Sequence, residues 1–253
     1  MMDDLGGKTV VVTGGSRGIG AAIARAVGGQ GARVLLHYGR SEVAAEALRT
    51  EIGAARCRLV QADLAAADGP AGLWRAATEA GERIDVLVNN AGIFETAAVD
   101  APAAAWHEAW SRVLQVNLLA PAELCREAIL HFRRHGGGRI INVASRAAFR
   151  GEAPDQMPYG ASKGALVTLT KTIARGFAAE GVLAFCIAPG FTETEMVTRN
   201  VDAKAVQRVI EEIPLGAMAP PEEIGRLAAF LCADGVRHLT GATFDVNGAS
   251  YLR

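Results

Sequence analysis

One short segment near the amino end predicts the fold of this chain. It reads Thr9-Val10-Val11-Val12-Thr13, followed by Gly14-Gly15-Ser16-Arg17-Gly18-Ile19-Gly20. The first part is uncharged and mostly β-branched, which is typical of a strand buried on both faces. Residues 19–27 then have helical spacing, so the glycines lie in a turn between strand and helix. Glycines there let the backbone approach a pyrophosphate at the helix amino terminus, although a tight turn without a ligand is the alternative for this segment alone.

The rest of the chain repeats this alternation of strand and helix. Six further short apolar runs are expected to be strands: residues 34–36, 58–61, 86–88, 140–143, 183–188 and 242–246. Helical patterns lie between them, and the longest are expected at residues 102–134 and 157–180. Such alternation predicts right-handed βαβ units. We therefore expect an α/β fold: a single domain over residues 1–253 with a Rossmann-like, doubly wound sheet of about seven parallel strands and helices on both faces.

In such a fold, ligands bind outside the carboxyl ends of the strands. Residues 191–218 differ in composition from the rest, because they mix Thr, Glu, Asn and Pro with a short helical pattern. We expect them to form a substrate lid within the same domain.

Composition excludes several classes of protein. The net charge of −1 over 253 residues gives no electrostatic reason to bind nucleic acid or an anionic membrane. The four cysteines lie far apart without zinc-ligand spacing, which predicts free thiols in a reducing compartment and no metal. No signal peptide is recognisable in residues 1–5, and no apolar run reaches the length of a membrane span. We expect a cytoplasmic protein.

The end of the second expected strand bears on which dinucleotide fits. An acidic residue there would hold the ribose 2′-hydroxyl of NAD. The run Leu36-His37-Tyr38-Gly39-Arg40-Ser41 carries no carboxylate before Glu42. Arg17 and Arg40 suit a 2′-phosphate, so NADP(H) is favoured over NAD(H); two solvated arginines are the alternative. Tyr38, Arg40 and Ser41 are candidate cofactor residues, although His37 and Tyr38 also suit packing.

A tyrosine and a lysine, Tyr159 and Lys163, lie four residues apart at the start of an expected helix and therefore share a face. A phenol titrates near pKa 10, which is high for proton transfer at neutral pH, and a neighbouring ammonium is expected to lower that pKa. Chance would give roughly 0.05 such pairs in this chain, so an incidental match is improbable. Ser145 follows the fifth expected strand and is placed to hydrogen-bond a carbonyl oxygen, although serine there also suits a plain turn.

Together these residues resemble the short-chain dehydrogenase/reductase family over nearly the whole chain. The glycine turn and Tyr-x-x-x-Lys are joined by further motifs in the order of the family. They are Asn89-Asn90-Ala91-Gly92, Val116-Asn117, Pro189-Gly190-Phe191-Thr192-Glu193-Thr194, Leu239-Thr240-Gly241 and Asp245-Val246-Asn247-Gly248.

The resemblance implies a role for each of four catalytic residues. Tyr159 would give a proton to a carbonyl oxygen during reduction, or remove it during oxidation. Lys163 would lower the pKa of Tyr159 and hold the nicotinamide ribose. Ser145 would orient and polarise the carbonyl. Asn117 would kink its helix and hold a water that links Lys163 to solvent.

The resemblance also implies a set of residues that contact the cofactor. Asp63 would contact adenine, residues 89–92 would line the adenosine ribose, and residues 189–194 would contact the nicotinamide amide and the phosphates. The full set is Gly14, Ser16, Arg17, Gly18, Ile19, Gly20, Asp63, Leu64, Asn90, Ala91, Gly92, Tyr159, Lys163, Pro189, Gly190, Thr192 and Thr194. The usual assembly in the family is a homotetramer or homodimer.

Within the family the chain looks most like the 3-oxoacyl-[acyl-carrier-protein] reductases. Those enzymes hold the acidic helix of the carrier protein with two basic sites, and Arg133 with Arg134 would supply the first. Glu180 occupies the second, and this charge reversal argues against a carrier-protein partner. A small-molecule carbonyl or alcohol is the expected substrate. Its pocket is expected to be lined by Phe94, Phe149, Gln156, Met157 and Phe191; loop packing is the alternative for these side chains.

The main hypothesis is an NADPH-dependent reductase of a ketone or 3-oxoacyl thioester. A second is an NAD(H)-dependent dehydrogenase of a sugar, polyol or hydroxylated ring. A third, from another class, is a non-catalytic protein that senses the cofactor. The presence of Asn117, Ser145, Tyr159 and Lys163 together argues against the third hypothesis.

Overall fold

The computed structural model describes residues 4–79, 81–195 and 203–253. Its centre is one sheet of seven strands in the order β3-β2-β1-β4-β5-β6-β7. The strands are β1 (Thr9–Val12), β2 (Arg33–Tyr38), β3 (Cys57–Gln61), β4 (Val86–Asn89), β5 (Gly138–Val143), β6 (Val182–Pro189) and β7 (Thr243–Val246). Every neighbouring pair is parallel. The expected doubly wound parallel sheet is therefore confirmed.

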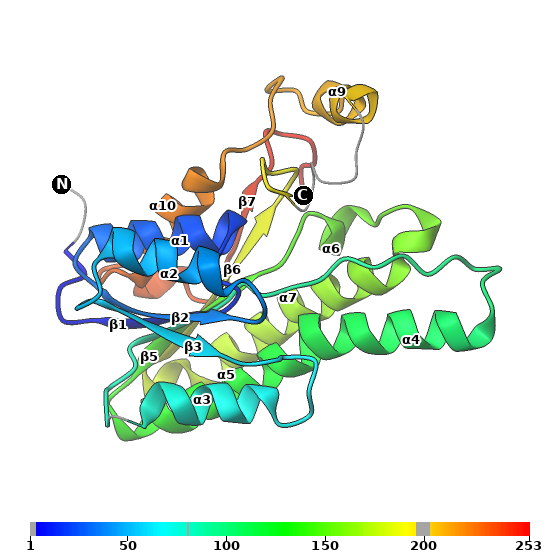
Figure 1. Cartoon of the computed structure of the whole chain (residues 1–253). Coiled ribbons are helices and arrows are strands. Elements are labelled where there is room, and N and C mark those ends of the chain that lie inside the picture. Colours follow the sequence, from blue (N-terminus) through cyan, green and yellow to red (C-terminus); the bar gives the residue numbers. More distant parts are fainter. Residues whose placement is uncertain (1–3, 80, 196–202) are drawn as a thin grey trace.

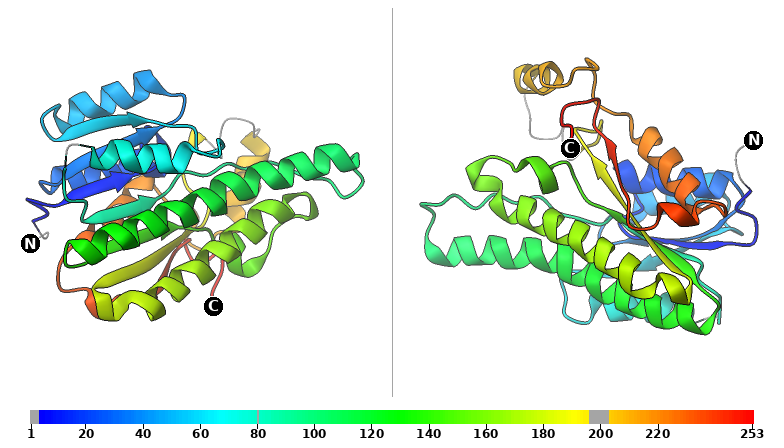
Figure 2. Two further views of the ribbon diagram at one scale, coloured as in Figure 1. Left: turned by 90° about the horizontal axis from the view of Figure 1, so that it is seen from below. Right: turned by 180° about the vertical axis from the view of Figure 1, so that it is seen from behind.

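Helices cover both faces of the sheet (Figures 1 and 2). On one face lie α1 (Gly18–Gly29), α2 (Glu42–Ile52) and α10 (Pro221–Cys232). On the other lie α3 (Gly69–Thr78), α4 (Ala103–Leu114), α5 (Ala120–Arg134) and α7 (Met157–Phe177). Successive strand residues point to opposite faces, so Val10 and Val12 join the core beneath α1 and α10, whereas Val11 joins the core against α3 and α5.

Both long helices expected from the sequence depart from regular α-helical geometry. The first is interrupted by a π turn, and the second ends in a 3-10 turn. The first is α4, then a π-helical turn, η1 (Gln115–Leu119), and then α5. The second is α7, which ends in a 3-10 turn, η3 (Ala178–Glu180). The π turn contains the buried Asn117, and such turns are frequent at functional sites. The remaining short elements are α6 (Ala147–Arg150), η2 (Pro154–Gln156) and η4 (Arg237–Leu239).

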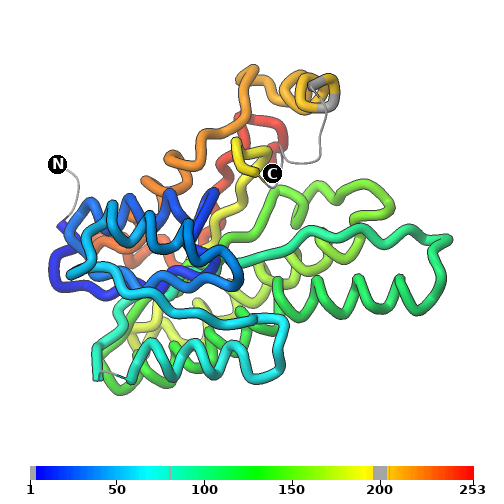
Figure 3. Tube along the Cα trace, viewed as in Figure 1, coloured from blue at the N-terminus to red at the C-terminus, as the bar shows by residue number. Residues whose placement is uncertain are grey.

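One helix, α9 (Ala203–Glu211), lies apart from both layers, beyond the carboxyl end of β6 (Figures 1 and 3). It belongs to the expected lid, residues 191–218, of which residues 196–202 lie outside the described residues. The lid stays a prediction. Within the described part of the chain, no helix has the length and apolar character needed to span a membrane, and the expected cytoplasmic location likewise stays a prediction.

Candidate functional site

Four neighbouring strands bring the predicted site segments to one edge of the sheet. β1, β4, β5 and β6 are adjacent and parallel, so their carboxyl ends meet there. The glycine turn follows β1, Asn90 follows β4, Ser145 lies two residues beyond β5, and Thr192 lies three residues beyond β6. This carboxyl edge is where doubly wound sheets bind ligands.

The backbone of the glycine turn lies so close to neighbouring backbone atoms that side chains would not fit at Gly14 and Gly20. Gly14 has a φ of +61°, and a Cβ there would lie 2.9 Å from the Cα of Ala91. A Cβ on Gly20 would lie 2.2 Å from the carbonyl oxygen of Gly14. The turn leads directly into α1, whose first residues have no side-chain cap. Its amino terminus therefore leaves backbone N–H donors for an anion, as a pyrophosphate requires.

Side chains from β2 and β4 hold this turn in place. The backbone N–H of Gly14 donates to Nδ1 of His37 at 3.0 Å, and Nε2 of the same ring lies 3.1 Å from the carbonyl of Ala62. Nδ1 accepts, so the ring is neutral with its proton on Nε2, and burial lowers the pKa of His37. The amide of Asn90 donates to the carbonyls of Thr13 and Gly14 at 2.9 and 3.1 Å. Sequence reasoning interpreted His37 only as a packing residue, because no motif marks it.

The expected catalytic side chains converge at the carboxyl edge. Ser145 lies close enough to Tyr159 for its hydroxyl to act on the pKa of the phenol. Nζ of Lys163 donates to the carbonyl of Val143, the last residue of β5, at 2.9 Å, and lies 5.7 Å from the centre of the Tyr159 ring. Phe94 packs edge-on against the same ring, with 5.2 Å between ring centres. A phenol, a hydroxyl and an ammonium thus lie together at the carboxyl edge of the sheet, as acid/base chemistry on a carbonyl requires.

The pKa expected for Tyr159 has to be corrected. The sequence predicted that the ammonium of Lys163 lowers it, but the protein packed around the phenol raises the pKa, although the residue keeps some exposed surface. The hydroxyl of Ser145 acts in the opposite direction, and the charge of Glu152 adds to the rise. Burial also lowers the pKa of Lys163 to about 8. Desolvation therefore outweighs the attraction between the two groups.

Asn117 connects the π turn to the loop after β4. Its Oδ1 accepts from the backbone N–H of Ile93 at 2.8 Å, and its Nδ2 donates to the carbonyl of Ile93 at 2.9 Å and to Oγ of Ser162 at 3.2 Å. The side chain is fully buried. Asn117 thereby fixes the loop that carries Gly92 and Phe94 beside the lysine, since a Cβ on Gly92 would lie 3.4 Å from Nζ of Lys163.

Most of the expected cofactor residues lie along this edge, and they fit a dinucleotide. Thr194 lies over the turn, because a Cβ on Gly18 would come within 3.2 Å of its methyl group. Asp63 accepts from the backbone N–H of Ala65 at 3.0 Å. Arg40 is exposed at the end of β2, beside Ser41. Arg17 is exposed and pairs with Glu195 at 3.4 Å. The cofactor needs two features that are present here. The glycines leave room for a pyrophosphate, and a buried ammonium lies near the tyrosine.

Tyr38 is the exception among these residues. Its side chain is packed into the core shared by β1, β2, α1 and α2. This position agrees with the packing interpretation of Tyr38, and its expected contact with the cofactor stays a prediction. The buried ring anchors the end of β2, from which Arg40 emerges.

The five residues expected to line the substrate pocket differ in exposure and in the side chains that they contact. Phe94 is 42 % exposed and contacts Tyr159, whereas Met157 is exposed at the start of α7 and Gln156 lies just before it. Phe149 stacks on Tyr251, and the guanidinium of Arg253 lies over its ring. The carboxyl terminus therefore packs on the loop after Ser145, which nothing in the sequence predicted.

Phe191, the fifth pocket candidate, carries the guanidinium of Arg146 over its ring at 4.2 Å. Arg146 directly follows Ser145, and its side chain is buried. Burial lowers the pKa of this guanidinium, with Arg150 adding to the fall and Glu152 and Glu212 opposing it. Sequence reasoning assigned no function to Arg146, because an arginine in a loop is ordinarily solvated.

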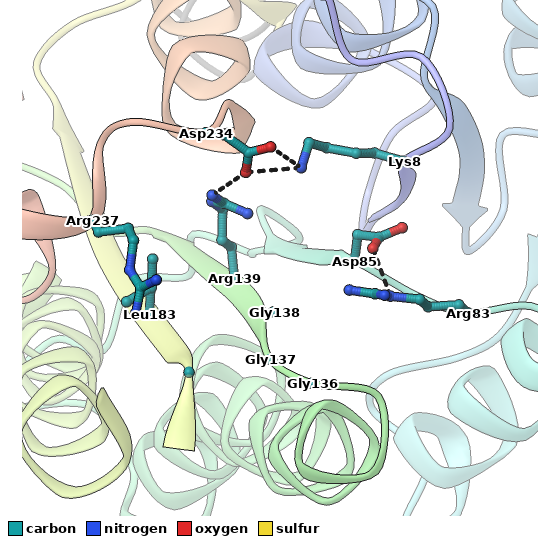
Figure 4. A pocket seen from close by; sticks show the side chains of 11 residues that line it. Lys8, Arg83, Asp85, Gly136, Gly137, Gly138, Arg139, Leu183, Asp234 and Arg237 are labelled. Carbon is teal, nitrogen blue, oxygen red and sulfur yellow. Dashed lines mark hydrogen bonds and ion pairs between the residues drawn. The ribbon is translucent and has the colours of Figure 1, made fainter. Parts of the chain in front are cut away.

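A second hollow of about 300 Å³ lies at the opposite, amino edge of the sheet (Figure 4). Its lining comes from residues at the amino ends of β1, β4, β5 and β6 and from Asp234 and Arg237, which follow α10. Asp234 binds Lys8 at 3.1 Å and Arg139 at 2.7 Å, and Arg83 pairs with Asp85 at 2.9 Å. None of the expected catalytic residues lines it. Over residues 4–79, 81–195 and 203–253, no group of His, Cys, Asp or Glu is placed to hold a metal ion.

The fold and this site define a class: a dinucleotide-binding oxidoreductase with a tyrosine-centred acid/base site. Comparison with known proteins gives the family. A family model described as enoyl-(acyl carrier protein) reductase matches residues 14–249. The relative "Nodulation protein G" from Rhizobium meliloti is 38 % identical over 98 % of this chain and 98 % of its own. A "3-oxoacyl-[acyl-carrier-protein] reductase" from Synechocystis is 37 % identical over 99 % and 100 %.

Solved structures agree with these relatives. The structure of a putative NAD(P)-dependent gluconate 5-dehydrogenase from Beutenbergia cavernae, with bound NADP, superimposes with a TM-score of 0.88 at 35 % identity, covering 98 % of each chain. A blue fluorescent protein from a metagenomic library in complex with NADPH gives 0.89 at 32 % identity, covering 98 % of this chain and all of the other. This chain belongs to the short-chain dehydrogenase/reductase family, and it is a nicotinamide-dependent oxidoreductase.

Proposed function

We propose that this enzyme reduces a carbonyl compound to a secondary alcohol with NADPH, and that Tyr159 is its proton donor. One observation carries the proposal: Tyr159 lies at the carboxyl edge with Ser145 and the buried ammonium of Lys163, whose Nζ is 5.7 Å from the centre of the phenol ring. The raised pKa of Tyr159 means that the phenol is protonated at neutral pH, so the proton that reduction consumes is present on the enzyme before the reaction.

The residues of the chain then have separate tasks. Bound NADPH supplies the hydride to the carbonyl carbon. Ser145 donates a hydrogen bond to the carbonyl oxygen and so stabilises the negative charge that develops there. Tyr159 gives its proton to that oxygen. Lys163, held by the carbonyl of Val143, places a positive charge beside the phenolate and makes loss of the proton easier in the transition state.

NADP(H) is proposed over NAD(H) for two reasons. Arg40 is exposed at the end of β2 and Arg17 at the start of α1, and no carboxylate precedes Glu42 to hold a ribose hydroxyl. Two of the similar solved structures also contain NADP or NADPH. Arg17 pairs with Glu195 at 3.4 Å, so Arg40 is the stronger candidate for the 2′-phosphate.

The proposed substrate is a ketone or a 3-oxoacyl thioester. The names of relatives support both, since they include 3-oxoacyl-[acyl-carrier-protein] reductase, acetoacetyl-CoA reductase and 3beta-hydroxysteroid dehydrogenase 1. Arg133 argues against a carrier-protein partner, because both oxygens of Glu180 bind its guanidinium, one of them at 2.8 Å. A small molecule is therefore the proposed partner of the site.

A dehydrogenase of a sugar or polyol, acting with NAD(H), is the second candidate. The similar structures from Beutenbergia cavernae and Agrobacterium tumefaciens are both described as putative gluconate dehydrogenases. Measuring the affinity for NADPH and NADH separates the two candidates. We also propose a homotetramer or homodimer, the usual assembly in the family, and light scattering of the purified chain tests it.

The test of the proposed function is the substitution Tyr159→Phe. It removes one hydroxyl, so NADPH binding should persist while turnover of a panel of ketones and acyl thioesters falls at least about 10³-fold. Tyr251→Phe is the matched control, because it removes a phenol hydroxyl outside the proposed site. Turnover by Tyr159→Phe at the rate of the unaltered enzyme would refute the mechanism.

A further inference from the structure

The guanidinium of Arg146 is buried without hydrogen bonds at its two terminal nitrogens. The residue is 2 % exposed, and within the described part of the chain neither Nη1 nor Nη2 has a hydrogen-bond partner. It lies on the ring of Phe191 at 4.2 Å, which satisfies the flat face of the cation but not its N–H donors. A buried charge without hydrogen bonds is costly, so the position calls for an anion.

The carboxylates around Arg146 do not meet this need. Oε2 of Glu212 lies 3.8 Å from Nη2 of Arg146, which is an ion-pair distance but too long for a hydrogen bond. The same oxygen lies closer to Nη1 of Arg150, at 3.3 Å, and the Glu212 side chain is 54 % exposed. Glu152 pairs with Arg150 at 3.5 Å. Both carboxylates are therefore directed at Arg150, which leaves Arg146 as the cation with unused donors.

The position of Arg146 beside the proposed catalytic residues suggests that the anion it binds is part of the substrate. Arg146 directly follows Ser145 in the chain. The charge of Glu152 acts on both Arg146 and Tyr159, so the guanidinium and the phenol lie near the same carboxylate. Phe191, beneath the guanidinium, belongs to the loop after β6 that flanks the site. A planar guanidinium with two unused donors fits a carboxylate in a bidentate manner.

We propose that Arg146 binds a carboxylate of the substrate, so that the enzyme reduces an oxo acid, with Glu212 remaining on Arg150. This inference rests on the proposed function and narrows it from carbonyl compounds in general to those that carry a nearby carboxylate. A monoanion suits the site better than a phosphate dianion, because the carboxylates of Glu152 and Glu212 on the neighbouring Arg150 would repel a second negative charge. A 3-oxoacyl thioester has no carboxylate at this distance, so the inference favours a free acid.

Two matched pairs of probes test it: acetoacetate against methyl acetoacetate, and levulinate against methyl levulinate. Within each pair the ester replaces the negative charge by a methyl group, and the two pairs differ in the distance of the carboxylate from the ketone. We expect kcat/KM with NADPH to be about ten- to a hundredfold higher for the acid of at least one pair, as a charge-assisted hydrogen bond provides. Arg146→Met should bring that ratio near one by raising KM for the acid, while the ester is unaffected.

Two further variants separate recognition from folding. Arg146→Lys keeps the charge but not the bidentate geometry, and it should keep part of the preference for the acid. Arg139→Met removes another buried arginine, at the amino edge, and should leave the ratio unchanged. Equal kcat/KM for acid and ester in the unaltered enzyme, or an equal loss of both in Arg146→Met, would overturn the proposal.

Binding to a variant without turnover keeps this test separate from that of the proposed function. The Tyr159→Phe enzyme loaded with NADPH should bind levulinate about tenfold or more tightly than methyl levulinate in calorimetry. The double variant with Arg146→Met should lose this difference. If Tyr159→Phe still turns over but prefers the acid, the proton donor is wrong and the carboxylate site stands. Binding of acid and ester alike, or of neither, overturns the carboxylate site.

Discussion

The two edges of the sheet each contain a buried arginine, and the two arginines differ in how closely a carboxylate approaches them. At the amino edge, Arg139 is 9 % exposed and donates to Asp234 at 2.7 Å, and Asp234 also binds Lys8 (Figure 4). At the carboxyl edge, Arg146 is more deeply buried, and the nearest carboxylate oxygen lies 3.8 Å away. Within residues 4–79, 81–195 and 203–253, Nε of Arg139 lacks a hydrogen-bond partner, and in Arg146 both terminal nitrogens lack one.

Two lysines, Lys8 at the amino edge and Lys163 at the carboxyl edge, differ in the same way as the two arginines. Lys8 pairs with Asp234, whereas Lys163 has only the carbonyl of Val143 as a hydrogen-bond acceptor in the described part of the chain, and burial lowers its pKa to about 8. At the amino edge, Lys8 and Arg139 share the carboxylate of Asp234, so each of these cations has an ion-pair partner at hydrogen-bond distance. Charges at the carboxyl edge are held without full compensation, and that is the condition in which they interact strongly with a ligand.

After that of Tyr159→Phe, the largest expected effect at the carboxyl edge is that of Ser145→Ala. Loss of the hydroxyl removes a donor to the developing negative charge, so kcat should fall about 10²- to 10³-fold while the affinity for NADPH stays within about twofold. Steady-state kinetics and fluorescence titration measure the two quantities. Asp234→Asn, at the amino edge, is the control and should not change kcat. A kcat for Ser145→Ala within a few-fold of the unaltered enzyme would break the contrast.

The next largest effect concerns the two ends of β2. Arg40→Asp places a carboxylate beside the proposed 2′-phosphate, so Kd for NADPH should rise about ten- to a hundredfold, whereas Kd for NADH should rise little or fall. Arg33 lies at the amino end of the same strand and pairs with Glu82 at 3.5 Å. Arg33→Asp should leave both constants unchanged. An equal rise for both cofactors in Arg40→Asp would count against the preference for NADP(H).

The pH dependence of reduction should follow Lys163. Its pKa of about 8 lies below the ordinary value, so the ammonium is present at neutral pH and is lost as pH rises through 8. We expect kcat/KM, which reports the free enzyme, to fall up to about tenfold per pH unit above that point. Stopped-flow or steady-state rates from pH 6 to pH 10 measure it. A profile that stays level to pH 10 would show that the charge of Lys163 does not assist the reaction.

The smallest effect belongs to the amino edge and has the opposite pH dependence. Hydrogen bonds from Lys8 and Arg139 hold the pKa of Asp234 below its usual range. Its contribution to stability is therefore present at neutral pH and is lost as pH falls below about 4. Because Asp234 is 80 % exposed, Asp234→Asn should lower the free energy of unfolding by only about 1 kcal/mol at pH 7, measured by urea denaturation. A loss that persists unchanged at pH 3 would contradict this origin.

Local sequence was sufficient for much of the fold and for the centre of the site. The β-branched run before Gly14 predicted β1 and its turn, and the spacing of Tyr159 and Lys163 placed both on one face of α7. The break at Asn117 followed from the family resemblance, and the structure shows a π turn there. Each of these features depends on residues within a few positions of one another, so periodicity and motif spacing suffice to predict it.

Other features of the site could not be predicted in this way. The pKa of Tyr159 was expected to fall and instead rises, because its direction depends on how much protein surrounds the phenol. The hydrogen bond from Gly14 to His37 joins two strands, and the packing of Tyr251 on Phe149 joins the carboxyl terminus to the loop after β5. Contacts between such distant segments leave no periodic signal in the sequence.

The sequence alone determined the order of strands and helices, the phosphate-binding turn and the tyrosine–lysine pair, because hydrophobic periodicity and side-chain spacing are local properties. Only the tertiary structure decided which charged groups are buried and which of them are compensated. Arg146 is buried because Phe191 covers its guanidinium and Glu212 approaches it, and these residues come from a different part of the chain. Desolvation is set by everything that packs around a group, and so it emerges only when the whole chain has folded.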